Sequence, residues 1–326
     1  MQTVKDMDSN DIKIAIILPA YNEASTIQRV VTDFHSILPQ AHIYVINNCS
    51  TDSTEEISLT TLNNLACEGG IIKAYPKGKG NAVRQAFISI DADYYVLVDS
   101  DCTYSSQDLP KLLKPVMSGK ADMVVGDRHL TGAYKKSNHR KLHNFGNRLV
   151  TRIINKSFGS NVNDVMSGYR VMTRELVKNS PILSEEFEVE TELTLHCLDK
   201  NYRLLEVPIE YMARPKGSFS KLNTYRDGLS VLKTIFEIYR HFKPLQFFSI
   251  VSMFFFIAGL YFGIPVIAQY LETGIVLYIP RAILSTGLMI FAIISFAIGV
   301  ILGTIERNNK FNYQLTRLHY REQHKR

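Results

Sequence analysis

The sequence predicts an α/β protein in which a mostly parallel sheet domain is followed by a hairpin of two transmembrane helices. Two observations carry this prediction. Short β-branched runs alternate with helical segments over roughly the first hundred residues, an order typical of parallel sheets. Toward the C-terminus, two long apolar runs contain no charged residue.

The predicted elements of the sheet domain follow one another in a βαβαβαβ order. The predicted strands are 13–18, 42–46, 70–74 and 94–98. The segments between them have helical character: 24–38, 51–65 and 79–89. Further on, 142–158 has apolar residues at helical spacing, with Arg148 and Arg152 beside them, and we expect this helix to meet anionic lipid headgroups.

The two apolar runs, 245–268 and 282–305, are each long enough to cross a bilayer, for which about 20 residues suffice. Pro265 lies inside the first run, and membrane helices tolerate such a proline. Basic residues flank the pair on both sides: Arg226, Lys233, Arg240, Lys243, Arg307, Lys310, Arg317, Arg321, Lys325 and Arg326. Basic flanks stay in the cytoplasm, so we expect both termini inside and the connecting loop outside.

The chain is therefore predicted to have four parts. They are a cytoplasmic domain at 1–223, a juxtamembrane amphipathic helix at 224–243, the hairpin at 244–306 and a basic cytoplasmic tail at 307–326. Residues 1–11 are polar and acidic, unlike a signal peptide. We expect a multi-pass protein of the inner (cytoplasmic) membrane, and a homo-oligomer is an open alternative to a monomer.

Composition excludes several classes of protein. The 326 residues are 46% hydrophobic and 21% charged, so the chain is neither a disordered tail nor a fibrous repeat. Its 4 cysteines lack CxxC or metal-ligand spacing, which argues against a disulfide scaffold and a zinc module. The net charge of +6 suits an anionic partner. We expect no nucleic-acid partner.

Polar residues follow each of the predicted strands, at 19–23, 47–52, 77–80 and 99–101. In a parallel sheet these segments converge on one edge, where ligands bind. Asp99 and Asp101 leave the last strand at alternate positions and are suited to Mg²⁺ or Mn²⁺. Lys77 and Lys79, with the glycines beside them, are predicted to approach a phosphate or ribose.

Taken in order, several motifs resemble the family 2 glycosyltransferases of the GT-A fold. They are LPAYNE at 18–23, NNCSTDST at 47–54, KGKGNAVRQAF at 77–87 and DSD at 99–101. Downstream motifs resemble the polyprenyl-phosphate branch, which includes dolichol-phosphate mannose synthase and bactoprenol glucosyltransferase. They are VVGDRH at 124–129, NDVMSGYRVM at 163–172, FEVE at 187–190, EVPIEY at 206–211 and RPKGSFSKL at 214–222. The resemblance covers roughly 13–243.

The resemblance implies a donor site. Its expected members are Pro19, Tyr21, Glu23, Asn48, Lys79, Asp99, Arg214, Ser220 and Lys221, with Asp99 and Asp101 as metal ligands. Asn48 corresponds to a contact to the nucleotide base. Asn47 and Asn48 stand where relatives usually have two aspartates, so the base stays open. Thr103 stands where many relatives have a metal-binding glutamine.

The resemblance also implies an acceptor site. Arg128 corresponds to an arginine at the lipid phosphate, and Arg140 and His143 are the nearest matches to two further contacts. Asp164, Ser167 and Arg170 fall in a block beside the sugar, and Glu190 is expected to support the site. Asp101, Arg128 and Asp164 are the expected catalytic residues.

The predicted reaction is inverting transfer of a hexose-type sugar from a nucleotide sugar, with UDP favoured, to polyprenyl (undecaprenyl) phosphate. A phosphate monoester is largely dianionic at neutral pH, so this acceptor needs no general base. Two alternatives stay open. One is a membrane-tethered transferase that adds a sugar to a lipid-linked saccharide, with Asp164 or Glu190 as its base. The other is an inactive nucleotide-sugar-binding scaffold.

Overall fold

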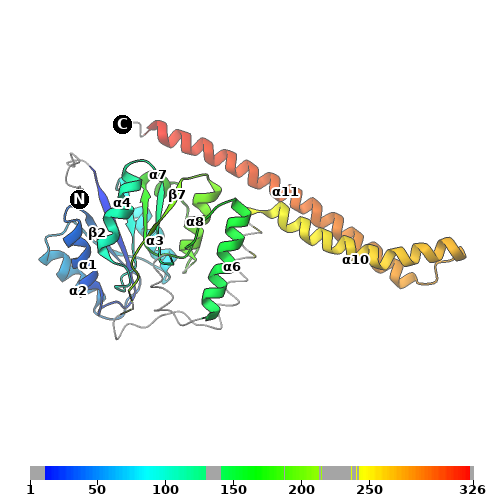
Figure 1. The fold of residues 1–326 in the computed structure, drawn as a ribbon, viewed down its shortest axis with the longest axis horizontal. Coiled ribbons are helices and arrows are strands. Elements are labelled where there is room, and N and C mark those ends of the chain that lie inside the picture. The colour runs from blue at the N-terminus through cyan, green and yellow to red at the C-terminus, as the bar shows by residue number, and fades with distance from the viewer. Residues whose placement is uncertain are drawn as a thin grey trace. The chain divides into compact units, whose positions relative to one another are not determined.

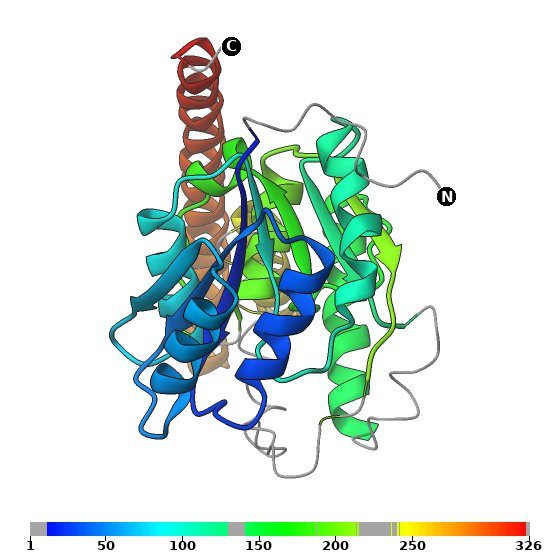
Figure 2. The same cartoon turned by 90° about the vertical axis from the view of Figure 1, so that its left-hand side faces the viewer.

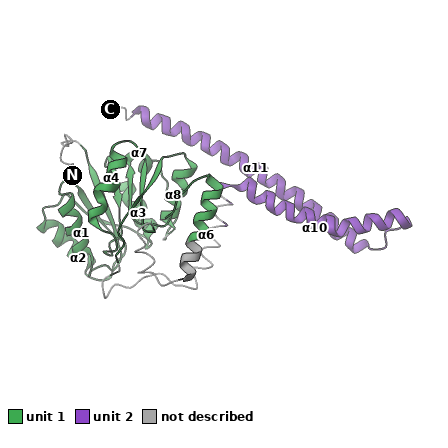
Figure 3. Ribbon diagram, viewed as in Figure 1, with its two compact units in different colours: residues 1–231 green, residues 232–326 purple. Residues whose placement is uncertain are grey.

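The computed structural model of the chain describes residues 12–129, 141–186, 188–212, 214, 236, 240 and 242–323, without the side chains of 141–147. The chain divides into two compact units, Met1–Val231 and Leu232–Arg326 (Figure 3).

Unit 1 is built on one 7-stranded sheet with the order β3-β2-β1-β4-β6-β5-β7. The strands are β1 Ile14–Ala20, β2 His42–Asn47, β3 Gly69–Lys73, β4 Tyr94–Leu97, β5 Met123–Asp127, β6 Arg170–Thr173 and β7 Leu204–Pro208. β6 is antiparallel to both of its neighbours, β4 and β5, and every other pairing in the sheet is parallel. The prediction of a mostly parallel sheet is confirmed.

Helices connect the strands and cover the sheet (Figures 1 and 2). They are α1 Ile27–Ile37, α2 Thr54–Asn64, α3 Lys79–Ser89, η2 Ser106–Asp108, α4 Leu109–Met117, α6 Lys141–Phe158, α7 Arg174–Lys178 and α8 Val189–Asp199. α2 begins three residues later than predicted because the Asp52 carboxylate accepts hydrogen bonds from the Thr54 backbone N–H and hydroxyl. The same carboxylate accepts from the Ala24 backbone N–H, which holds the turn before α1 outside the helix.

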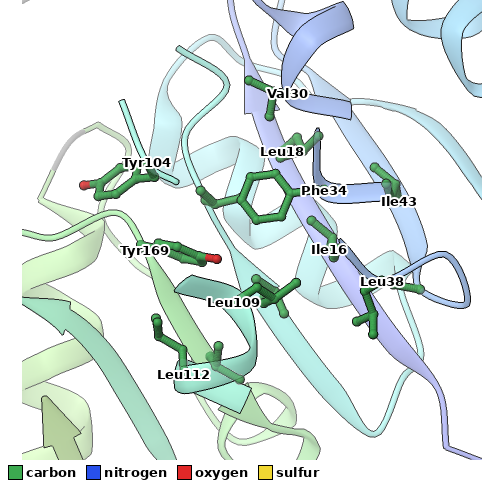
Figure 4. Close-up of a cluster of buried hydrophobic side chains, with 14 of the residues drawn as sticks. Ile16, Leu18, Val30, Phe34, Leu38, Ile43, Tyr104, Leu109, Leu112 and Tyr169 are labelled. Atoms are coloured by element: carbon green, nitrogen blue, oxygen red, sulfur yellow. The ribbon is translucent and has the colours of Figure 1, made fainter. Parts of the chain in front are cut away.

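The main core lies on one face of the sheet, beneath α1 and α4 (Figure 4). Strand alternation selects Ile16 and Leu18 of β1 for this cluster, where the Phe34 ring meets Tyr169 edge-on at 5.9 Å between centroids. On the other face, Phe87 of α3 packs edge-on against Tyr95. With both faces covered, β1, β4, β5 and β6 are largely buried, whereas the edge strands β3 and β7 are only partly buried.

The polar segments after β1 to β4 converge at the carboxyl edge of the sheet, as predicted. The Asn48 backbone N–H donates to the Ala20 carbonyl at 2.9 Å, and the Ser100 hydroxyl donates to the Pro19 carbonyl at 2.9 Å. Three residues along this edge, Asn22, Cys49 and Cys102, have positive φ of 53°, 62° and 59°. Left-handed backbone at non-glycine residues is often found at active sites and ligand-binding sites.

Helix α6 lies within one residue of the predicted helix 142–158. Among its described side chains, those of 148–158, Val150 and Ile154 are fully buried, whereas Leu149 and Ile153 are only partly buried. Arg148 and Arg152 are exposed. Burial of one apolar face therefore comes from packing in unit 1, and the two arginines are left on the outer surface.

Unit 2 contains α10 Pro244–Thr273 and α11 Ile279–Gln323, both long and apolar enough to cross a membrane. The two helices pack through small residues: a Cβ added at Gly263 would lie 2.5 Å from the Ser285 hydroxyl oxygen. The hydroxyls of Ser285 and Ser252 donate to the carbonyls of Gly259 and Ala292 on the facing helix, both at 2.8 Å. Close backbone approach and interhelical hydrogen bonds are how helices pair where no water drives burial. α11 continues as helix well beyond the predicted end of the apolar run at residue 305.

Candidate active site

The acidic pair lies directly after β4, at the carboxyl edge of the sheet. Asp101 is 4% exposed, and its Oδ1 accepts hydrogen bonds from the Thr103 backbone N–H at 3.1 Å and hydroxyl at 2.5 Å. Asp99 packs against Gly168, where an added Cβ would lie 2.7 Å from Asp99 Oδ2. A side chain at residue 168 would displace the Asp99 carboxylate, so glycine is required there.

A protein cation pairs with each of the two carboxylates. Lys79 Nζ lies 2.5 Å from Asp99 Oδ1 and also donates to Glu190 Oε1. Arg214 Nη2 lies 2.5 Å from Asp101 Oδ2. Three elements far apart in sequence, the start of α3, the start of α8 and the segment after β7, therefore meet at this acidic pair.

These pairings hold the buried groups in their charged forms. Burial by itself would lower the pKa of Lys79, but Asp99 and Glu190 outweigh it and raise that pKa above its ordinary value. Burial likewise favours neutral Asp99, yet Lys79, with Arg214 and Arg128 further away, lowers the pKa of Asp99. Asp99 is thus a carboxylate at neutral pH.

The oxygen atoms of the acidic pair fit Mg²⁺ or Mn²⁺ whose remaining coordination positions are filled by a bound substrate. Asp99 and Asp101 offer carboxylate oxygens on one edge, and Mg²⁺ is often held by one or two carboxylates plus substrate phosphates. Among the residues that the structure describes, no three His, Cys, Asp or Glu side chains form a ready-made cage. The Thr103 hydroxyl donates a hydrogen bond to Asp101, so it supports that carboxylate and is not a metal ligand in this arrangement.

Asn48 has a different position from the one expected of a base contact. Both N–H groups of its amide are used, donating to the carbonyls of Ala74 and Pro76 at 3.0 Å, and its Oδ1 accepts from the Gly78 backbone N–H at 2.6 Å. The side chain, 4% exposed, thus braces the segment between β3 and α3. No amide N–H is left to donate to a base.

The glycines of the KGKG segment also have a role other than the predicted one. A Cβ on Gly78 would lie 2.2 Å from the Glu185 carbonyl oxygen, and one on Gly80 would lie 2.1 Å from that of Ser184. The Gly80 backbone N–H donates to the Glu185 carbonyl at 2.9 Å. These glycines allow the chain at 184–185 to approach, and their N–H groups are not available to cradle a phosphate.

The remaining described donor residues lie at the same edge of the sheet. Lys77 Nζ lies 3.9 Å from the centre of the Tyr21 ring, a cation–π contact. Glu23 is buried, accepts from the Thr26 hydroxyl and is anchored by its backbone N–H to the Thr54 hydroxyl at 2.9 Å. Pro19 contributes its carbonyl to Ser100.

Arg128 follows β5 and forms the centre of the expected acceptor half. Its Nε donates to Asp164 Oδ2 at 2.7 Å and its Nη2 to Asp164 Oδ1 at 2.8 Å, a bidentate pair. The guanidinium carbon also lies 5.5 Å from the centre of the Tyr211 ring. Asp164 is fixed in turn, because its backbone N–H donates to Glu206 Oε1 at 2.8 Å.

This pairing decides what Asp164 can do chemically. Burial alone would raise the pKa of Asp164, but the Arg128 guanidinium outweighs burial and lowers that pKa. A carboxylate with both oxygens bound to a buried guanidinium is a poor proton acceptor. Asp164 therefore orients Arg128, and Glu190, bound to Lys79, has an equivalent supporting position.

Ser167 and Arg170 are internal rather than exposed to a ligand. Arg170 is fully buried, and its guanidinium donates to the carbonyls of Ser167 at 2.9 Å and Val165 at 2.8 Å and to the Thr194 hydroxyl at 2.9 Å. It holds the loop that carries Asp164. Arg140, Ser220, Lys221 and the side chain of His143 lie outside the described residues.

Some residues of the site were not singled out from the sequence. The Tyr104 hydroxyl accepts from the Gly168 backbone N–H at 2.9 Å, and its ring packs edge-on against Tyr211 at 5.4 Å. Glu206 receives the two backbone N–H groups of the Asp164 loop. Gly168, Glu206 and Tyr211 lie inside motifs that were quoted for the resemblance, which is the signal that could have found them.

Fold and site together define the GT-A class: a mostly parallel sheet with an acidic pair at its carboxyl edge. Residues 15–180 match the model of "Glycosyl transferase family 2", and the chain belongs to this family. The glycosyltransferase AglJ of Haloferax volcanii is 34% identical over 243 residues, which cover 73% of this chain and 76% of the relative.

Two further comparisons agree. A dolichyl-phosphate hexose transferase of Haloferax volcanii is 29% identical over 225 residues, covering 69% of this chain and 93% of the relative. The glucosyl-3-phosphoglycerate synthase of Mycobacterium tuberculosis, solved with Mn²⁺, uridine diphosphate and phosphoglyceric acid, superposes with a TM-score of 0.54 at 20% identity. That match covers 69% of this chain and 78% of the other, and it shows the shared fold.

Proposed function

We propose that this glycosyltransferase moves a hexose-type sugar from a nucleotide sugar to the phosphate of a polyprenyl lipid. The observation that carries the proposal is the buried bidentate pair of Arg128 and Asp164, which presents an oriented guanidinium on the same unit as the acidic pair. Arginine grips phosphate bidentately and stays charged at any physiological pH. Relatives named for dolichyl-phosphate hexose transfer and dolichol-phosphate mannosyl transfer support this acceptor class.

The site has the groups that such a transfer needs, and both carboxylates that were considered as a base, Asp164 and Glu190, are ion-paired. Asp99 and Asp101 would hold Mg²⁺ or Mn²⁺, which neutralises charge on the departing diphosphate when bound. Arg128 orients the acceptor phosphate and offsets repulsion between two anions. Since Asp164 and Glu190 are both ion-paired, transfer to a sugar hydroxyl, which needs a base, is disfavoured.

Membrane attachment belongs to the same proposal. The acceptor lipid resides in the bilayer, and α10 and α11 are long and apolar enough to anchor the enzyme there. The basic flanks of the hairpin favour a cytoplasmic catalytic unit, where nucleotide sugars are made. Direct displacement by the phosphate oxygen gives inversion at the anomeric carbon, and a uridine nucleotide is the favoured donor.

The test is a transfer assay with the full-length protein in detergent and four radiolabelled donors: UDP-glucose, UDP-galactose, UDP-N-acetylglucosamine and GDP-mannose. Undecaprenyl phosphate is the acceptor, with a lipid-linked saccharide in parallel and an Asp101→Ala variant as the inactive control. We expect metal-dependent product on the lipid phosphate with one donor. Product on the saccharide alone would refute the acceptor, and metal-dependent nucleotide binding without any transfer would indicate a scaffold.

A further inference from the structure

The acidic pair is already neutralised by the protein itself. Asp99 Oδ1 holds the Lys79 ammonium and Asp101 Oδ2 holds the Arg214 guanidinium, each at 2.5 Å. The Lys79 side chain is 11% exposed and that of Arg214 34%, so one cation is enclosed and the other is open to solvent. Each carboxylate thus directs one oxygen to a cation of the chain.

A divalent metal requires these same carboxylates. A dication that approaches Asp99 and Asp101 meets two positive groups at hydrogen-bond distance from its ligands, and repulsion between like charges at such range is strong where water is scarce. Metal binding must therefore move Lys79 and Arg214 away from the carboxylate oxygens. Once moved off Asp99, the enclosed ammonium keeps Glu190 as a partner, and a second anion would restore the pairing that it has lost, since a poorly paired buried charge is costly.

The diphosphate of a nucleotide donor is the anion that arrives with the metal. Lys79 remains tied to Glu190 after Asp99 releases it, so the ammonium stays at the edge of the site where a phosphate would lie. Arg214 reaches the acidic pair from the segment after β7, and its exposed position allows it to swing onto a phosphate. Both cations can exchange a carboxylate for a phosphate without leaving the site.

We propose that Lys79 and Arg214 are exchangeable counter-ions of the acidic pair, which make metal binding depend on a nucleoside diphosphate. The free enzyme then binds metal weakly, and the two ligands bind together. This coupling is reciprocal, since a nucleotide that raises metal affinity has its own affinity raised by the metal by the same factor. The inference rests on the proposed function only because it assumes that the donor carries a nucleoside diphosphate.

The experiment measures binding without any sugar or lipid acceptor. Mn²⁺ is titrated into the full-length protein in detergent and free Mn²⁺ is read by electron paramagnetic resonance, with and without saturating UDP or GDP. In Lys79→Met, which keeps chain length and removes the charge, we expect Mn²⁺ alone to bind about tenfold tighter. The same substitution should weaken UDP or GDP binding at saturating Mn²⁺ by about tenfold or more.

Tighter Mn²⁺ binding together with weaker nucleotide binding in the same variant would not be expected if Lys79 had only a structural role. Lys79→Arg, which retains the charge, should leave bare Mn²⁺ affinity close to the wild-type value. Lys73→Met removes the same charge from an exposed lysine paired with Glu55 and serves as the matched control, with no change in either titration. Arg214→Met should repeat the Lys79→Met pattern to a smaller degree, because Arg214 is more exposed.

Loss of Lys79 leaves Asp99 and Glu190 facing each other, so Lys79→Met is also made together with Glu190→Gln to protect folding. Tight Mn²⁺ binding by the wild-type protein without nucleotide would overturn the proposal. So would weaker or unchanged bare Mn²⁺ affinity in both Lys79→Met and Arg214→Met. Because no acceptor is present, failure of the transfer assay with intact Mn²⁺–nucleotide coupling would refute the proposed function alone.

Discussion

The two halves of the site hold their charges in different ways. In the metal half, Lys79 and Arg214 each touch one oxygen of Asp99 or Asp101. In the acceptor half, Arg128 engages both oxygens of Asp164. Single contacts are exchangeable, whereas a bidentate pair fixes both position and plane. Under the proposed exchange of counter-ions, the first half rearranges when ligand binds, whereas the second half is oriented in advance.

Asp101→Ala should break the metal half completely. The variant loses a ligand oxygen and leaves the departing diphosphate uncompensated, so we expect sugar transfer to fall about a thousandfold or more. The radiolabel assay measures the loss, and detergent gel filtration checks that the protein is folded. Asp91→Ala, at an exposed aspartate paired with Arg174, is the control and should transfer at the wild-type rate.

Arg128→Ala should break the acceptor half alone. An oriented charge that acts in the transition state is worth about 3 kcal/mol, so transfer should fall about a hundredfold. Donor affinity, measured by calorimetry with Mn²⁺, should change little. Arg128→Lys should recover only part of the activity because an ammonium keeps the charge and loses the fork. Donor affinity that collapses together with transfer would place Arg128 in the nucleotide site instead.

Asp164→Asn sharpens the comparison by keeping shape and removing charge. One carboxyl oxygen of the bidentate pair becomes an amide nitrogen, which cannot accept from Arg128, so the guanidinium loses its fixed plane. We expect about tenfold slower transfer, with the loss appearing in the KM for the lipid phosphate. The lowered pKa of Asp164 keeps its carboxylate ionised at neutral pH, so this residue contributes no pH dependence near neutrality. A bell-shaped profile that Asp164→Asn flattens would show that it acts as a base.

The smallest expected effect is on the pH dependence of stability, and it comes from His196 of α8, which is neutral at pH 7. Burial and the nearby Lys200 lower the pKa of His196 from 6.5 to about 4, although Asp199 acts in the opposite direction. Below pH 6.5 the imidazole of His196 binds a proton in the unfolded chain, whereas in the folded protein it stays neutral down to about pH 4. Stability is therefore complete above pH 6.5 and declines toward pH 4, by about 1 to 2 kcal/mol between pH 8 and pH 5.

A thiol-reactive dye follows this decline as labelling beyond that of the partly exposed Cys49 and Cys67, because Cys102 and Cys197 are buried in folded unit 1. The fall in melting temperature from pH 8 to pH 5 should be smaller in His196→Gln than in the wild-type protein. Equal falls in the two proteins would mean that other groups set the acid sensitivity. Transfer at pH 8 should be the same for both.

Local patterns were enough to predict the first four strands, but β5, β6 and β7 were not predicted as strands. The predicted helix 79–89 coincides with α3, and all four predicted strands lie within two residues of the observed ends. Helix starts at α1 and α2 were placed too early, because the Asp52 carboxylate that holds both turns bonds to residues on either side of β2.

The class of fold, the apolar hairpin and the gathering of polar residues at one sheet edge can all be predicted from the sequence. These follow from periodicity, length and strand order, which are properties of neighbouring residues. Three features depend on the folded arrangement instead: Asn48 braces a loop, the KGKG glycines admit another segment, and Lys79 meets Glu190, 111 residues away. Which buried charge finds which partner depends on proximity in space, and no local pattern encodes it.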